Sequence, residues 1–149
     1  MKWIMVANSN DCRIYEYDKN IKKLTLINEI SHPENKLKNR DLITDRPGHY
    51  SLNATTRGSY EPEMNTHDTA VNKFAKEMAL YLNAGRNKHA YDQLILLMPP
   101  VMEGLLIKHL KKQIFSYIEQ IVQKNLVNLS EHELKLYVAK LLRRGATIH

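Results

Sequence analysis

The sequence predicts a single α/β domain with a mixed sheet, spanning residues 1–149. Two apolar runs, residues 3–8 (WIMVAN) and 94–98 (LILLM), are typical of strands that are covered on both faces. Several other segments carry apolar residues at helical spacing. The predicted order is therefore three strands, a long loop, a helix, a strand, a helix, an ambiguous segment and a final helix, as in a layered domain.

The first three strands are expected to form consecutive hairpins. Turn residues at 9–11 follow the first strand, and residues 12–18 (CRIYEYD) form the second. Alternation gives this strand two faces: Arg13, Tyr15 and Tyr17 on one, and Cys12, Ile14 and Glu16 on the other. A turn at residues 18–20 leads to a third strand, where Leu24, Leu26 and Ile30 are expected to share a face.

Capping and breaking residues frame the helices. Thr66 is a candidate N-cap for a helix whose apolar spacing continues to Leu82, and Gly85 is its expected end. Two prolines at 99–100 stop the second apolar run, and a further helix is predicted around residues 105–110. Ser130 and Glu133 form a capping box for the last helix, which is expected to end at Gly145.

Residues 114–123 are compatible with two structures. Ile114, Ile118, Ile121 and Val122 fit one helical face, which would extend the preceding helix. The β-branched and aromatic composition equally permits a last strand. Periodicity alone favours the helix, and both interpretations stay open.

Composition and charge limit the classes of protein that fit. No run approaches the ~20 apolar residues that a membrane-spanning helix needs, and the apolar start is too short for a signal peptide. The single cysteine, Cys12, excludes an internal disulfide and a cysteine-built zinc site, so a cytoplasmic location is expected. Lys and Arg outnumber Asp and Glu by 22 to 16, which favours an anionic partner.

The predicted loop at residues 31–65 carries the densest chemistry. Arg40, Arg46 and Arg57 can bind phosphates with their planar forks of donors, and His49 and Tyr50 can stack on an unpaired base. Gly48 follows a proline in a turn signal. The loop holds five basic and five acidic residues and is neutral overall. The alternative is that Arg40 pairs with Asp41 or Asp45 and the loop only wraps the surface.

Signals for catalysis and metal binding are weaker. Asp41, Asp45 and His49 are the candidates for acid–base chemistry or metal ligation in a hydrolase hypothesis. The seven histidines show no ligand spacing, and we predict no cofactor and no metal. The pair His67-Asp68 is expected in the first turn of a helix. His109 lies on an apolar helical face and is expected to be a hydrogen-bonded histidine in the core or at its boundary. Cys12 is interpreted as a packed side chain rather than a nucleophile.

The last third of the chain is basic. Residues 101–149 hold eight Lys or Arg and four Glu. Lys140, Arg143 and Arg144 lie near the end of the last helix, where positive charge is favourable. A solvated helix face and an extension of a phosphate-binding surface both fit this pattern.

Several of these segments together resemble the bacterial host attachment protein family. The resemblance covers nearly the whole chain, and its most specific part is RDLITDRPG at residues 40–48. It is supported by the prolines at 99–100 with Gly104 and Leu105. The family is regarded as a relative of the middle domain of archaeal and eukaryotic peptide-chain release factors. The resemblance therefore implies a ribonuclease-H-like fold and a strand near residues 117–124.

The resemblance does not imply the hydrolytic activity of those release factors. Their corresponding loop carries Gly-Gly-Gln, which positions water to release peptide from tRNA. Residues 31–65 contain neither this motif nor any glutamine, and Asn125 stands where the family pattern has an acidic residue. What the resemblance implies is a long loop, with Gly48 and His49 near its tip, on a domain able to enter an RNA-lined site.

The leading hypothesis is a cytoplasmic, non-enzymatic protein that associates with the ribosome or RNA and affects host attachment indirectly. Phosphate contacts would come from Arg40, Arg46 and Arg57. One rival is a hydrolase that uses Asp41, Asp45 and His49. The other is a protein-interaction module in host attachment.

Overall fold

The computed structural model describes residues 1–32 and 60–148, with side chains described for 1–32 and 69–143. Its strands are β1 (Lys2–Ala7), β2 (Asp11–Asp18), β3 (Lys23–Ser31), β4 (Gln93–Leu97) and β5 (Ile118–Val122). They form one sheet in the order β3-β2-β1-β4-β5. The pairs β1–β2 and β2–β3 are antiparallel, whereas β4 and β5 continue parallel to β1. The predicted mixed α/β architecture is confirmed.

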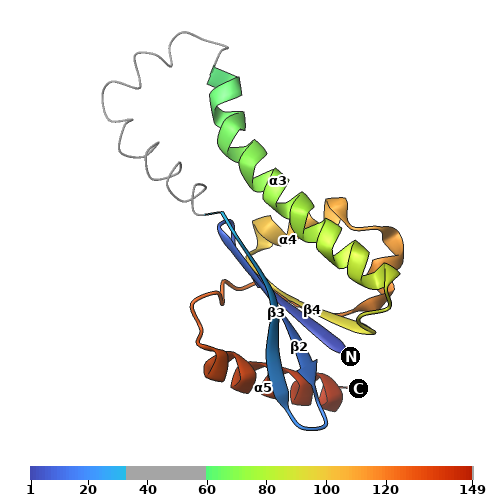
Figure 1. Cartoon of the computed structure of the whole chain (residues 1–149). Coiled ribbons are helices and arrows are strands. Elements are labelled where there is room, and N and C mark those ends of the chain that lie inside the picture. The colour runs from blue at the N-terminus through green and yellow to red at the C-terminus, as the bar shows by residue number, and fades with distance from the viewer. Residues whose placement is uncertain (33–59, 149) are drawn as a thin grey trace.

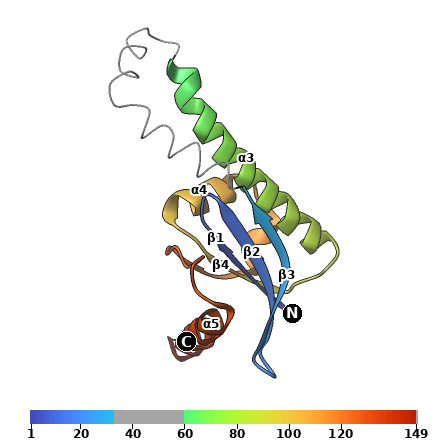
Figure 2. The ribbon, with the colours of Figure 1, turned by 60° about the vertical axis from the view of Figure 1, so that its left-hand side comes forward.

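Helices cover both faces of this sheet (Figures 1 and 2). The long helix α3 (Tyr60–Asn87) and α4 (Pro100–His109) lie on one face, and α5 (Glu131–Ile148) lies on the other. A short 3-10 helix, η3 (Lys112–Tyr117), leads into β5. The first turns of α3 project beyond the edge of the sheet (Figure 1).

The central strand β1 is buried along its whole length, which explains its continuous apolar sequence. Trp3 and Met5 face the core beneath α3 and α4, while Ile4 and Val6 face the core beneath α5. Lys2 at the start of the strand is also buried, and its ammonium pairs with the carboxylate of Glu119. The two cores therefore share one strand between them.

The prediction of a common face for the apolar residues of β3 is wrong. Leu24 lies in the core beneath α5, but Ile30 packs against the core beneath α3 and α4. The pairing register explains the difference, because Tyr15 lies opposite Leu26 while Ile14 lies opposite Asn28. The extra residue between them is a β-bulge, which exchanges the faces of the strand beyond it.

Helix α3 begins earlier and ends later than predicted. Residues 60–65 are helical, so Thr66 is not an N-cap, and only residues 33–59 of the predicted loop lie outside the described residues. His67-Asp68 therefore lies beyond the first turn, which corrects that prediction. Pro62 is tolerated because the first turn of a helix needs no backbone donor there. Gly85 lies inside the helix rather than at its end.

The C-terminal half settles the open alternative at residues 114–123. Residues 112–117 form η3 and residues 118–122 form β5, which pairs with β4. The capping box is confirmed: the backbone N–H of Glu133 donates to Ser130 Oγ at 3.1 Å, and that of Ser130 donates to Glu133 Oε1 at 2.9 Å. This bonding lowers the pKa of Glu133. Helix α5 runs to Ile148, so the predicted end at Gly145 is wrong.

Gly85 allows α3 to lie directly against the indole of Trp3. The ring of Trp3 stacks on Tyr81 with centroids 5.4 Å apart, and the ring of Tyr91 lies tilted against it with centroids 4.7 Å apart. A Cβ placed on Gly85 would lie 2.6 Å from the indole, closer than any normal contact. Because the rings of Tyr81 and Tyr91 both lie against the indole, it has little room to move away.

We expect Gly85→Ala to destabilise the protein by about 1–3 kcal/mol, the usual cost of overpacking a core. The matched control is Gly104→Ala in α4, where an added Cβ meets nothing within 4 Å. The control should gain about 0.5–1 kcal/mol from helix propensity. Urea unfolding of the two variants measures both effects, and equal stabilisation by both substitutions would contradict this packing.

Cys12 lies in the core beneath α3 and is fully buried, as predicted. Burial is the main reason that the pKa of its thiol is raised, and the nearby carboxylates of Glu77 and Asp11 add to the effect. A thiol held neutral and covered is a poor nucleophile.

We therefore expect the thiol of Cys12 to resist an aromatic disulfide reagent for many minutes at pH 8 in the native protein. After unfolding in urea, one thiol per chain should react, because the chain has a single cysteine. Absorbance of the released thiolate measures both states. Rapid stoichiometric reaction of the native protein would show that the strand is open to solvent.

Candidate functional site

The carboxyl ends of the parallel strands β1, β4 and β5 lie at one edge of the sheet, which we call the carboxyl edge. The chain leaves β1 toward β2 on one side and leaves β4 toward β5 on the other. Such a change of direction is where open α/β sheets usually hold ligands. β3 ends at this edge too, so residues 33–59 follow from it in sequence.

A hydrogen-bonded turn fixes the β1 side of the carboxyl edge. Asn8 Oδ1 accepts the backbone N–H groups of Asn10 and Asp11, both at 2.9 Å. Ser31 Oγ donates to Asp11 Oδ1 at 3.0 Å, and the backbone N–H of His32 donates to the carbonyl of Asn10 at 2.7 Å. The end of β3 is therefore attached to the turn between β1 and β2.

A second contact attaches His32, directly after β3, to α3. The Nε2 atom of His32 lies 2.8 Å from Glu77 Oε1, and the imidazole lies against the ring of Phe74 with centroids 4.9 Å apart. This imidazole–carboxylate pair bridges β3 and α3. The rigid body therefore holds the chain at His32, immediately before residues 33–59.

The β4–β5 side of the same edge is polar and internally bonded. Gln123 Nε2 donates to Glu103 Oε1 at 2.9 Å, which links the end of β5 to α4. Between α4 and α3, His109 Nε2 lies 2.9 Å from Asn72 Oδ1. This half-buried position confirms His109 as a histidine at the boundary of the core.

The predicted site residues lie outside the described part of the chain: Arg40, Asp41, Asp45, Arg46, Gly48, His49 and Arg57 all fall within residues 33–59. The structure therefore brings none of them into a described contact, and their roles stay predictions. Among residues 1–32 and 60–148, no group of three His, Cys, Asp or Glu side chains is arranged to hold a metal ion.

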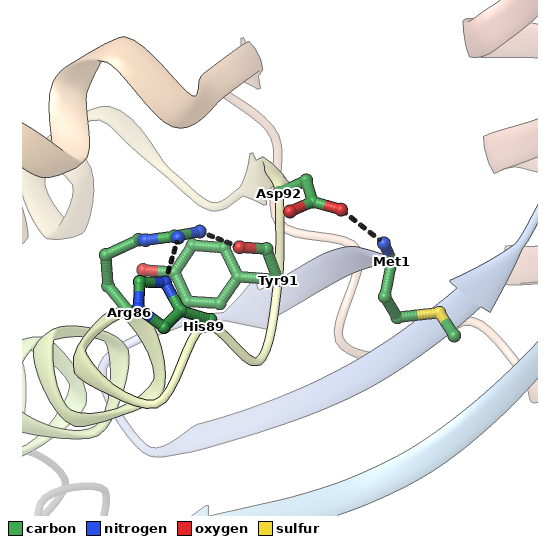
Figure 3. Close-up of polar contacts among 5 residues, drawn as sticks. All are labelled: Met1, Arg86, His89, Tyr91 and Asp92. Carbon is green, nitrogen blue, oxygen red and sulfur yellow. Dashed lines mark hydrogen bonds and ion pairs between the residues drawn. The ribbon is translucent and has the colours of Figure 1, made fainter.

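The arginines whose side chains are described make internal contacts. Arg86 donates to the carbonyl of Tyr91 and lies 2.8 Å from His89 Nδ1 (Figure 3). Its guanidinium also covers the ring of Tyr117, 4.0 Å from the ring centroid. The phenol of Tyr91 donates to the carbonyl of Leu82 at 2.8 Å, and burial raises the pKa of Tyr91 to about 12. This cluster joins the end of α3 to β4 and is structural.

Arg13 also makes contacts within the fold. Its guanidinium donates to the carbonyl of Val127 and lies 3.9 Å from the carboxylate of Glu29. It links β2 to the loop before α5 and to β3. Within the described residues, free positive charge at the surface is therefore carried mainly by lysines.

One surface was not found by sequence reasoning. An open groove of about 700 Å³ lies between the β2–β3 turn and the start of α5. Its lining residues are Ile21, Lys22, Lys23, Leu24, Ser130, Glu131, His132 and Lys135. The lysine-rich turn at residues 19–23 was the available signal, but its partner segment lies more than a hundred residues away.

One structural finding and two comparisons with known proteins bear on identity. None of the helices in the described residues is both long and apolar enough to cross a membrane. No curated protein matches the sequence. A protein-family model described as "Protein required for attachment to host cells" matches residues 3–138, which span all five strands apart from Lys2 and reach the first part of α5. The chain therefore belongs to the family of proteins required for attachment to host cells.

Proposed function

We propose that the protein supports host attachment indirectly, from the cytoplasm, as a non-enzymatic protein that binds RNA on its own or within the ribosome. Membership of the family indicates a role in attachment to host cells. The proposal adds the location, the partner and the mode of action.

The strand order and pairing directions fit the ribonuclease-H-like fold that the family resemblance implies, and with it a relation to the release-factor middle domain. In that relation, a long segment after the third strand enters an RNA-lined site. The matching segment here, residues 33–59, lacks Gly-Gly-Gln, which favours binding without hydrolysis.

The place of this segment in the sequence, directly after His32, is the observation that carries the proposal. It follows directly from the carboxyl edge, where His32 is attached to Glu77 and to the β1–β2 turn. It contains Arg40, Arg46 and Arg57, whose guanidinium groups suit phosphate oxygens. Three arginines in contact with a phosphate backbone would give binding that depends strongly on salt.

We expect the protein to bind single-stranded RNA at low salt, and Arg40→Gln, Arg46→Gln and Arg57→Gln together to weaken binding by at least about tenfold. If each arginine contacts one phosphate, the slope of log K against log salt should fall by about 2 units. Fluorescence anisotropy over a salt series measures both quantities.

The matched control removes three exposed lysines from the face covered by α3: Lys73→Gln, Lys76→Gln and Lys112→Gln. This variant has the same net charge and should lose little affinity. Equal losses of RNA affinity in both variants would show that binding follows net charge and does not use a specific site. Absence of RNA binding at low salt would rule out the proposal. Hydrolysis of the RNA, abolished by Asp41→Asn with His49→Ala, would instead favour the hydrolase hypothesis.

A further inference from the structure

The β2–β3 hairpin projects from the end of the molecule opposite the carboxyl edge (Figure 1). Ile21, in its turn, is 66% exposed. Lys22 beside it has φ of 53°, a left-handed conformation that tightens the turn. The hairpin therefore presents an apolar tip on a tight turn.

Lysines surround this tip and continue across the groove to α5. Lys22, Lys23 and Lys135 line the groove, and none of them has an ion-pair partner among the described residues. Glu131 is the only acidic residue in the lining. The nearby Glu133 uses its carboxylate in the capping box. The groove therefore carries a net positive charge that internal contacts do not neutralise.

The chemistry of this groove favours an anionic lipid surface over RNA. RNA sites that recognise unpaired bases use aromatic rings for stacking, and arginine forks hold phosphates in defined geometry. The described residues that line the groove include no Arg, Phe, Tyr or Trp, and their single aromatic ring is the imidazole of His132. Lysines are flexible point charges that suit a plane of headgroups, and an exposed aliphatic tip gains free energy by leaving water.

Exposed apolar and basic side chains also continue along the outer side of α5. Leu136 is 57% exposed and lies one helical turn beyond His132, which lines the groove. Lys140 follows Leu136 by a further turn and is exposed as well. Apolar and basic side chains therefore alternate from the hairpin tip along the start of α5.

We propose that the β2–β3 turn and the start of α5 dock on the surface of a membrane rich in anionic lipid, with Ile21 entering the headgroup region. Lys22, Lys23 and Lys135 would contact the headgroups. One aliphatic tip and a few lysines give a reversible, salt-sensitive association rather than permanent anchoring. This docking is independent of RNA binding at the carboxyl edge, because it uses the opposite end of the molecule.

Vesicle co-sedimentation of the full chain tests this proposal. The protein should bind phosphatidylcholine vesicles containing about 30% phosphatidylglycerol at low salt and leave them at high salt, as Debye screening requires. Lys22→Asn, Lys23→Gln and Lys135→Gln together should weaken binding by about 100-fold, taking about fivefold for each lysine near the surface. Asn is chosen at position 22 because it tolerates the left-handed turn.

Two further variants separate the contributions. Ile21→Ser should weaken binding by about tenfold without changing net charge, because it removes the apolar tip. The control variant Lys73→Gln, Lys76→Gln and Lys112→Gln removes the same charge from the other face and should bind as the unmodified protein does. Thermal unfolding of each variant confirms that the fold is retained.

Four results would overturn the proposal: no binding to anionic vesicles, equal binding to pure phosphatidylcholine, equal losses in the groove and control variants, or no effect of Ile21→Ser. RNA binding measured on the same groove variant should be unchanged. Loss of RNA binding with vesicle binding retained would reassign the groove to RNA. Failure of RNA binding in the unmodified protein would leave the vesicle result standing, so the two proposals fail separately.

Discussion

Burial of β1 on both faces is the constraint on which the rest of the structure depends. A strand that gives Trp3 and Met5 to one core and Ile4 and Val6 to the other must have helices above and below it. It must also have strands on both sides, because its buried backbone groups need partners. β2 supplies them antiparallel and β4 parallel. This mixed pairing places the ends of β1 and β4 at the carboxyl edge and the β2–β3 turn at the opposite end.

The two ends of the molecule consequently differ in how their polar and charged side chains are paired. At the carboxyl edge, polar side chains bond to one another, as Ser31 does to Asp11 and Gln123 to Glu103, and they fix the chain immediately before residues 33–59. At the hairpin end, Lys22, Lys23 and Lys135 stay free of ion pairs within the described residues. One end fixes the chain at Ser31 and His32, whereas the other presents charge directly to solvent.

The local sequence pattern was enough to identify an element where the strand is buried on both faces or where the capping residues are neighbours in sequence. The apolar runs of β1 and β4, and the capping box of Ser130 and Glu133, identified their elements directly. Pattern failed where distant partners decide the outcome. Ile118 and Ile121 fit a helical face as well as a strand, and pairing with β4 selects the strand. The face of Ile30 depends on a bulge against β2, and the basic groove exists only because α5 lies beside a turn far away in sequence.

The division of work between arginine and lysine follows from their side-chain chemistry. The planar guanidinium of Arg86 meets a carbonyl, an imidazole and the ring of Tyr117 together, and that of Arg13 joins a loop carbonyl to Glu29. A lysine ammonium cannot make such a set of planar contacts, so it gains less inside the fold and stays hydrated outside. The lysines that remain at the surface act over a distance set by salt rather than by geometry. The exposed lysines Lys22, Lys23 and Lys135 therefore attract an anion by charge density rather than by a planar set of donors.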